Sequence, residues 1–261
     1  MKKILAMLLA LMMVLPFVGC AGEETPATTD AVETEETAEV TATEEATADA
    51  TKEAEPVKVD YAGYVAAEMD TKLTIEAYVQ ATQSWWDGKI TVYAADQDGA
   101  YFIYEMACTE DEAKLLTPGV KIRVTGVKGE WSGEVEIMDA TFVIVDEADT
   151  YVADVFDATE LLGTDDLIKH QNEKAAFKGL TIKKIAYKND QPGDGNDIYV
   201  TVTKGEADYE FCVEAYLTGP DTDVYKAFAE LKEGDVIDVE GFIYWYNGVN
   251  THITSVVKAA A

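Results

Sequence analysis

Flat aromatic side chains gather at a few turn-like segments of this 261-residue chain, and stacking is the chemistry they could supply. All four tryptophans lie in such segments, which read "TQSWWDG", "GEWSG" and "YWYNG". An exposed aromatic ring can hold a sugar or a base face to face, at about 1–3 kcal/mol for each stacked base. The candidate ligand-binding residues are Trp85, Trp86, Trp131, Tyr244, Trp245 and Tyr246.

Core packing is the competing interpretation of the same residues. Successive side chains of a strand point to opposite faces, so either Tyr244 or Trp245 is expected to point into the core. A tryptophan beside a hairpin turn, such as Trp131, can also pack across its own strands. Trp85 and Trp86 are adjacent and cannot both point inward in a regular strand, so at least one of them is expected to be exposed.

Cation binding is a second kind of chemistry, indicated by the acidic segment "NDQPGDGND". Its Asp190, Asp194 and Asp197 offer the oxygen ligands that calcium prefers. The segment lacks the EF-hand pattern, and Asp, Asn and Gly are also ordinary turn residues. We therefore expect a solvated turn, with these three aspartates as weak metal candidates, and no cofactor.

Enzyme signatures are not found in the sequence. His170 and His252 are the only histidines, and no nucleophile elbow, phosphate loop or zinc motif accompanies them. A pair of catalytic carboxylates stays open, because fifty acidic residues make any chosen pair uninformative. The expectation is a protein without catalytic residues.

Residues 1–19 have the layout of a secretory signal, with Lys2 and Lys3 before a short apolar run. Its end, "LPFVGC", resembles the lipobox of bacterial lipoproteins, with Phe17 where an aliphatic residue is usual. The resemblance implies that Cys20 is acylated and anchors the chain to the cell membrane, facing the extracytoplasmic side. Ordinary cleavage, with Cys20 as a bystander, is the alternative.

After Cys20, residues 21–57 are rich in Thr, Ala and Glu and hold twelve acidic residues and one lysine. A segment with so little apolar surface cannot offset its chain entropy, so 20–57 is expected to be a disordered tether. Removing the tether and the two signal lysines from the totals leaves 38 acids and 17 bases in 58–261, a net charge of about −21. Nucleic-acid affinity comes largely from Lys and Arg on phosphates, so this charge makes nucleic acid an unlikely partner.

An internal repeat sets the architecture. The segments "LTPGVKIRVTG" (116–126) and "LKEGDVIDVEG" (231–241) share the pattern L-x-x-G-x-x-I-x-V-x-G, and Gly133 and Gly248 follow at the same offset. A match of this length indicates a repeated structural unit.

Each unit has the same predicted order of elements: three strands, a short helix and two strands. The first unit is predicted at 73–81, 90–95, 101–108, a helix over 109–116, 120–127 and 135–145. The second is predicted at 180–187, 198–203, 209–217, a helix over 221–231, 236–244 and 249–257. Thr109 and Glu112 are spaced as a capping box, and Asp221 or Asp223 is available as the cap of the second helix.

This order resembles the oligonucleotide/oligosaccharide-binding (OB) barrel, and the chain resembles uncharacterised bacterial surface lipoproteins with tandem OB folds. The expected fold class is mainly β, two tandem five-stranded OB-like barrels with one short helix each; two halves of another small β-barrel are the alternative. The predicted domains are a first barrel over 58–148, a helical connector over 149–176 and a second barrel over 177–261.

OB barrels bind between the loops that join strands 1–2 and strands 4–5, and the tryptophans lie in those loops. We therefore expect a membrane-anchored binding protein that engages an oligosaccharide or a peptide. The alternatives are a nucleic-acid-binding accessory of an extracellular nuclease and a structural protein of a surface assembly. Cys108 and Cys212 could pair outside the cell or stay free, and the oligomeric state is not predicted.

Overall fold

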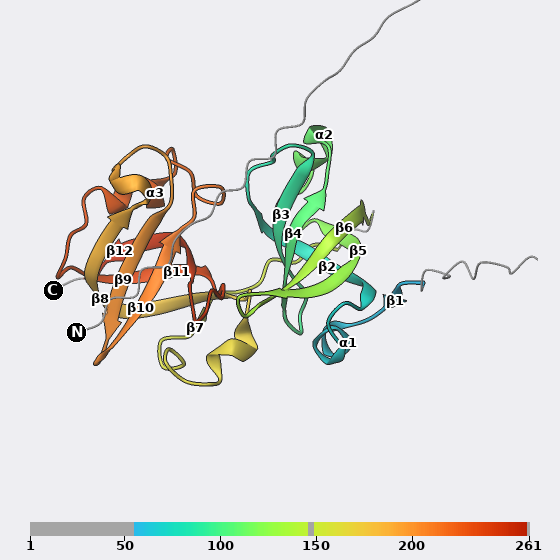
Figure 1. The fold of residues 1–261 in the computed structure, drawn as a ribbon, viewed down its shortest axis with the longest axis horizontal. Coiled ribbons are helices and arrows are strands. Elements are labelled where there is room, and N and C mark those ends of the chain that lie inside the picture. Colours follow the sequence, from blue (N-terminus) through green and yellow to red (C-terminus); the bar gives the residue numbers. More distant parts are fainter. Residues whose placement is uncertain (1–54, 146–148, 260–261) are drawn as a thin grey trace, which may run out of the picture. The chain divides into compact units, whose positions relative to one another are not determined.

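A computed structural model of the chain describes residues 55–145 and 149–259 (Figure 1). The first half contains β1 (Val57–Lys58), α1 (Tyr61–Ala66), β2 (Lys72–Thr82), β3 (Lys89–Ala95), β4 (Ala100–Ala107), α2 (Glu110–Ala113), β5 (Lys121–Trp131) and β6 (Glu134–Ile144). The second contains β7 (Phe156–Asp157), η1 (Leu167–His170), β8 (Lys174–Tyr187), η2 (Lys188–Asp190), β9 (Ile198–Lys204), β10 (Ala207–Val213), α3 (Asp223–Phe228), β11 (Val236–Phe242) and β12 (His252–Lys258). Contacts group both halves into one compact unit.

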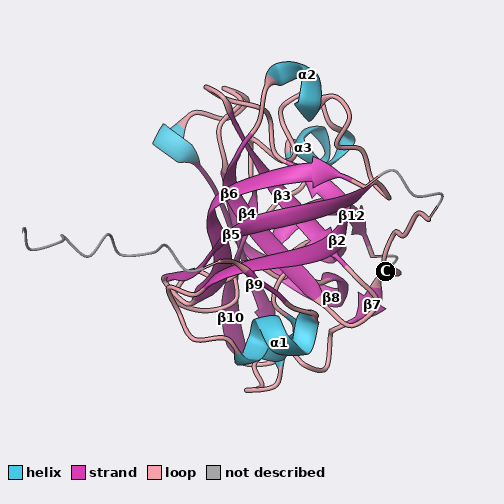
Figure 2. Ribbon diagram, turned by 90° about the vertical axis from the view of Figure 1, so that its right-hand side faces the viewer, coloured by secondary structure: helices cyan, strands magenta, loops and turns pink. Residues whose placement is uncertain are grey.

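The two halves have the same strand connections. In the first, β2 pairs with both β3 and β5, β4 pairs with β3, and a short parallel pairing of β4 with β6 completes the ring. In the second, β8, β9, β10, β12 and β11 follow the same order, and Cys212 pairs with His252 where β10 meets β12. This order confirms the expected fold class of tandem OB-like barrels, and Figure 2 shows how little of the fold is helical.

Alternation along each strand builds two separate cores. On β3, Ile90, Val92 and Ala94 point into the first barrel, while Tyr93 between them points outward. On β9, Ile198, Val200 and Val202 point in the same way into the second barrel. Each barrel therefore has its own apolar interior, and residues on the outer faces are left to contact other parts of the chain.

The last glycine of each repeat lies where strand 4 bends. A Cβ on Gly126 would come within 2.7 Å of the Met138 carbonyl oxygen, and one on Gly241 would come within 2.3 Å of the His252 carbonyl oxygen. The pairing register shifts beside both glycines. Only glycine allows the backbones of strands 4 and 5 to approach this closely, so the repeat pattern encodes the bend of the barrel.

The capping box of α2 is confirmed, because Thr109 and Glu112 cap each other's backbone N–H groups. The cap of α3 differs from the prediction: Thr222 accepts from the Tyr225 N–H, rather than Asp221 or Asp223. The predicted helical connector is mostly not helical. The connector contains only the short η1 and β7. The extended backbone of β7 pairs in parallel with β8 and so adds a strand to the edge of the sheet.

Lys128 fastens α1 to the first barrel. Its Nζ donates to the carbonyl oxygens of Tyr64, Val65 and Ala67 at 2.7–3.0 Å, although the side chain is buried. Burial lowers the pKa of this ammonium group. A cation at the C-terminal end of a helix satisfies carbonyl groups that have no partner within the helix.

Candidate functional site

The two barrels meet at the outer face of β3 and β4. Tyr93 and Phe102 form a cluster with Phe242 that is separate from both barrel cores. Tyr93 stacks on Phe242 with ring centroids 4.3 Å apart, and Phe102 meets Tyr244 edge to face at 5.2 Å. Strands 2 and 3 provide the binding face of an OB barrel. The second barrel therefore covers part of that face on the first.

His252 belongs to this contact. The Tyr93 hydroxyl is hydrogen-bonded to His252 Nδ1, and the imidazole stacks on Tyr244 at 4.3 Å. Burial lowers the pKa of His252 to about 3, so the ring is neutral near pH 7. It joins the barrels as an uncharged packing and hydrogen-bonding group.

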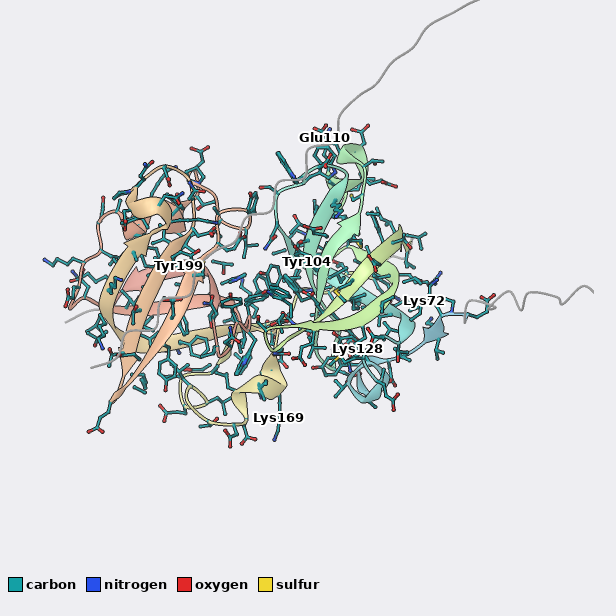
Figure 3. All side chains as sticks on the ribbon, viewed as in Figure 1. Lys72, Tyr104, Glu110, Lys128, Lys169 and Tyr199 are labelled. Carbon is teal, nitrogen blue, oxygen red and sulfur yellow. The ribbon has the colours of Figure 1, made fainter. Side chains whose placement is uncertain are left out.

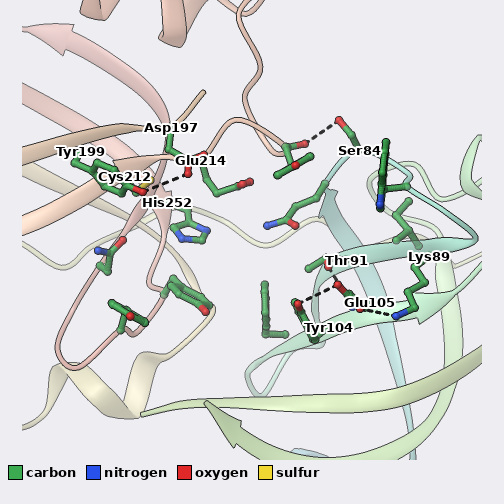
Figure 4. Close-up of a pocket in the computed structure, with 18 residues that line it drawn as sticks. Ser84, Lys89, Thr91, Tyr104, Glu105, Asp197, Tyr199, Cys212, Glu214 and His252 are labelled. Atoms are coloured by element: carbon green, nitrogen blue, oxygen red, sulfur yellow. Dashed lines mark hydrogen bonds and ion pairs between the residues drawn. The ribbon is translucent and has the colours of Figure 1, made fainter. Parts of the chain in front are cut away.

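Beside the contact the two barrels leave a cleft of about 630 Å³ (Figure 4). The first barrel contributes the loop between β2 and β3 together with the outer face of β3 and β4, and the second contributes residues of β9 and β10 and the segment between β11 and β12. Strands 2 and 3 of both barrels thus face one space. The lining consists of Gln83, Ser84, Trp86, Lys89, Ile90, Thr91, Phe102, Tyr104, Glu105, Asp197, Tyr199, Cys212, Glu214, Tyr216, Tyr244, Tyr246, Asn250 and His252.

Seven of the lining residues are aromatic, and several present their rings to solvent. Trp86 is 74 % exposed, and Tyr216 and Tyr246 are more than half exposed. Tyr104 on β4 and Tyr199 on β9 come from opposite barrels (Figure 3). Exposed flat rings on both sides of one cleft are suited to stacking a planar ligand.

On the first-barrel side, Glu105 holds an unusual backbone. Its φ is +44°, a left-handed conformation that residues other than glycine rarely adopt. Its N–H donates to Thr91 Oγ1 at 3.2 Å, and its carboxylate accepts from Lys89 at 2.6 Å and from the Tyr104 hydroxyl at 3.0 Å (Figure 4). The hydrogen bond from Lys89 lowers the pKa of Glu105. The carboxylate therefore fixes the phenol of Tyr104 and neutralises the ammonium of Lys89.

The second-barrel side carries Asp197 and Glu214. Asp197 accepts from the Lys188 ammonium at 2.8 Å and from the Ala215 N–H at 3.0 Å. Glu214 accepts from the Leu217 N–H at 2.8 Å, and burial raises its pKa to about 7. Within the described part of the chain no lysine or arginine forms an ion pair with Glu214. The two acids thus differ: one is paired with a cation, and the other is desolvated.

The strand 4–5 hairpins of the two barrels contact each other. Glu134 is fully buried and accepts from the Trp245 N–H at 2.8 Å and from Asn172 Nδ2 at 2.7 Å. The Asn247 N–H donates to the Ser132 carbonyl at 2.7 Å. Burial raises the pKa of Glu134 to about 8. The sequence predicts ligand contacts at these hairpins. In the structure, part of each hairpin instead contacts the other barrel.

This contact answers whether Trp245 is core or exposed. Its indole packs against the second-barrel core, and a Cβ on Gly133 of the other hairpin would meet its ring at 2.7 Å. Trp131 is 61 % exposed but does not line the cleft. Trp85 is less exposed than Trp86, and its Nε1 donates to the Cys108 carbonyl at 2.7 Å. Of the predicted ligand residues, the structure brings Trp86, Tyr244 and Tyr246 together in the cleft.

The sequence did not single out Tyr93, Glu134 or Glu214. Tyr93 reads as an ordinary strand residue, and the two glutamates are hidden among fifty acids. The sequence does contain one signal of a buried outer face. Tyr93 and Phe102 occupy strand positions that alternation assigns to the outside of the barrel, where a solvent-exposed strand would carry polar residues.

Two aspartates of the acidic turn have partners within the chain. Asp194 bonds to Asn196 and Asp197 is paired with Lys188, and no cluster of three metal-binding side chains occurs within residues 55–145 and 149–259. Cys108 and Cys212 are buried free thiols whose pKa is raised by burial. Cys20 lies outside the described residues. None of the helices in the described ranges has the length and apolar character needed to cross a bilayer.

Comparison with known proteins found resemblances among solved structures alone. No protein-family model matches the chain, and no curated protein does. Among solved structures, the chain resembles a murine DNA-binding protein bound to double-stranded DNA, at 12 % identity over 72 % of this chain and 97 % of that one, with a TM-score of 0.35. It also resembles the Ifi202 HINa domain in complex with 20-base-pair DNA, at 12 % identity over 66 % and 84 %, with a TM-score of 0.32. A third is a replication protein A heterotrimer bound to single-stranded DNA, at 11 % identity over 70 % of this chain and half of that one, with a TM-score of 0.29.

The ligand expected from the sequence differs from the ligands with which these neighbours are described. The prediction favoured an oligosaccharide or a peptide and counted nucleic acid as unlikely, whereas the solved structures that match are described with DNA. Net charge bears on contacts to phosphate and does not affect stacking of bases on aromatic rings. Similarity at this level assigns no function, so a functional proposal has to rest on the cleft itself.

Proposed function

We propose that this chain binds single-stranded nucleic acid and holds unstacked bases in the cleft between its two barrels. The observation that carries the proposal is the convergence of strands 2 and 3 of both barrels on one aromatic-lined space. Stacking on Trp86, Tyr104, Tyr216 and Tyr246 needs bases whose faces are free, which a duplex does not offer.

The charge of the cleft defines the mode of binding. Lys89 is the lysine of the lining, and Glu105 already neutralises it. Few phosphates can therefore be contacted, and stacking supplies most of the affinity. Since each contacted phosphate on a single strand adds about −0.7 to the slope of log K against log salt, a shallow slope is expected.

A fluorescence-anisotropy titration of the full chain with a labelled mixed-sequence 8-mer tests the proposal. Trp86→Ala removes a 74 % exposed ring from the cleft and is expected to weaken binding about 5- to 150-fold, the equivalent of one stack. Trp131→Ala is the matched control, because that ring is 61 % exposed outside the cleft. Equal losses in the two variants, or no binding of the 8-mer, would overturn the proposal.

We also propose a location and a non-catalytic role. The lipobox-like "LPFVGC" and the acidic 21–57 segment support a chain tethered through Cys20 on the extracytoplasmic side, as an accessory to nucleic-acid uptake or breakdown there. Detergent phase partitioning is the test: the chain is expected in the detergent phase and Cys20→Ser in the aqueous phase. Partition of both into the aqueous phase would contradict the anchor.

A further inference from the structure

The cleft carries a feature that stacking alone does not use: an acceptor side chain that has no ion-pair partner among the described residues. Glu214 directly follows β10 and lines the cleft with His252 and Tyr199 (Figure 4). The Leu217 N–H holds one carboxylate oxygen at 2.8 Å, and the Thr218 N–H holds the Glu214 backbone carbonyl at 2.8 Å. The segment around Glu214 is thus held in place by its own turn.

The other polar lining groups are less suited to select a base. Glu105 already accepts hydrogen bonds from Lys89 and Tyr104, and Asp197 accepts them from Lys188 and the Ala215 N–H. Gln83 and Asn250 each carry both a donor and an acceptor, so they can pair with any base edge. A carboxylate only accepts hydrogen bonds, and this makes Glu214 the group that discriminates.

Base edges differ at the position such an acceptor would meet. Cytosine carries an amino group on C4, which donates to Glu or Asp. Uracil has the same ring size but carries a carbonyl oxygen there, which a carboxylate repels. Building on the proposed function, we infer that Glu214 makes the cleft select bases with an exocyclic amino group over uracil and thymine.

The selection depends on ionisation of Glu214. Burial raises its pKa to about 7, so the group is a carboxylate at pH 8.5 and a neutral acid at pH 5.5. Nearby titratable and charged groups are Asp197, Lys188 and Tyr199 on the β9 side, Cys212 and Tyr216 along β10 and the loop after it, Tyr244 and His252 elsewhere in the second barrel, and Tyr93 of the first barrel. His252 stays neutral at both pH values, because its pKa is about 3.

The test compares labelled d(C)8 with d(U)8 on the full chain at pH 8.5. Unmodified protein is expected to bind d(C)8 about tenfold more tightly, the lower part of the range for one specific base contact. Glu214→Gln presents a donor as well as an acceptor and is expected to bring the two affinities within about twofold of each other. Glu210→Gln is the matched control, because this exposed carboxylate on β10 does not line the cleft, and it is expected to keep the preference.

The outcomes separate the two proposals. Binding of neither strand rejects the proposed function itself. Equal binding of both strands by the unmodified chain rejects the base selection and leaves the proposed function standing. A preference for d(C)8 that persists in Glu214→Gln has the same meaning. If Glu214→Gln does not fold, the unmodified chain at pH 5.5 replaces it: the preference is expected to narrow there, since a protonated carboxyl can donate to the uracil O4, and an unchanged ratio overturns the inference.

Discussion

Glu134 of the first barrel accepts a hydrogen bond from the backbone N–H of Trp245 in the second, at 2.8 Å and with the carboxylate fully buried. The two residues lie in corresponding hairpins of the repeat. This pairing and the Tyr93–Phe242 stack leave the cleft bounded by both barrels. The cleft is therefore a consequence of how the repeats pack, and is not present in either barrel alone.

Removing the Glu134 carboxylate tests this contact between the two hairpins. In Glu134→Ala the Trp245 N–H and Asn172 Nδ2 lose their acceptor, and an unsatisfied buried donor costs about 1–3 kcal/mol. Glu134→Gln keeps one acceptor oxygen and carries no charge, so its loss is expected to be smaller. Urea unfolding followed by circular dichroism measures both. An alanine variant as stable as the unmodified chain would show that the contact between the hairpins contributes nothing to the free energy of unfolding.

Stability is expected to fall between pH 5.5 and pH 8.5. Burial raises the folded-state pKa of Glu134 to about 8 and those of Glu136 and Glu214 to about 7, above the usual 4.5 of glutamate. Over this window the folded chain binds more protons than the unfolded chain, so the free energy of unfolding decreases as pH rises. The stabilisation is complete below about pH 4.5 and is lost as pH rises through 7 to 8.

The size of this fall is on the order of a few kcal/mol, since each unit of pKa shift corresponds to about 1.4 kcal/mol. Carboxylates with lowered pKa, such as Glu76 and Asp157, are ionised throughout the window and do not contribute to the slope. Urea midpoints at pH 5.5, 7.0 and 8.5 measure the effect, and Glu134→Gln is expected to flatten it. A free energy of unfolding that rises with pH would contradict the burial of these acids.

Gly241→Ala tests the close approach of strands 4 and 5. The added Cβ would lie 2.3 Å from the His252 carbonyl oxygen, so the backbone must shift, at about 1–3 kcal/mol. Gly219→Ala is the control, because its Cβ would meet only the Ala215 carbonyl at 3.3 Å. Thermal unfolding of the two variants is expected to separate them clearly. Equal melting temperatures would argue against the tight bend.

The strand pattern and the repeat were sufficient to predict the barrels. Alternation at Ile90, Val92 and Ala94 marks an inward face, and the matched Gly126 and Gly241 mark the bend. The cleft could not be predicted in this way. Alternation shows that Tyr93 faces outward but not what covers it, and the partner of Glu134 is 111 residues away in the chain. The aromatic loops indicated the cleft only in part, since Trp86 lines the cleft while Trp245 packs against the second-barrel core.

Salt dependence distinguishes stacking from binding to phosphates. With Lys89 already paired to Glu105, the slope of log K against log salt for an 8-mer is expected to lie near −1. Anisotropy titrations between 50 and 300 mM salt, roughly the range over which phosphate contacts weaken, measure it. A slope of about −4 or steeper would place the strand on a basic surface outside the cleft.

Ultraviolet cross-linking of the bound 8-mer, followed by mass spectrometry of the cross-linked peptides, shows directly whether the bases lie in the cleft between the barrels. Aromatic side chains that stack on bases are well placed to cross-link to them. Cross-links are expected at Trp86, Tyr104, Tyr216 or Tyr246, all of which line the cleft. Cross-links confined to Trp131, or to other residues outside the cleft, would contradict binding in the cleft.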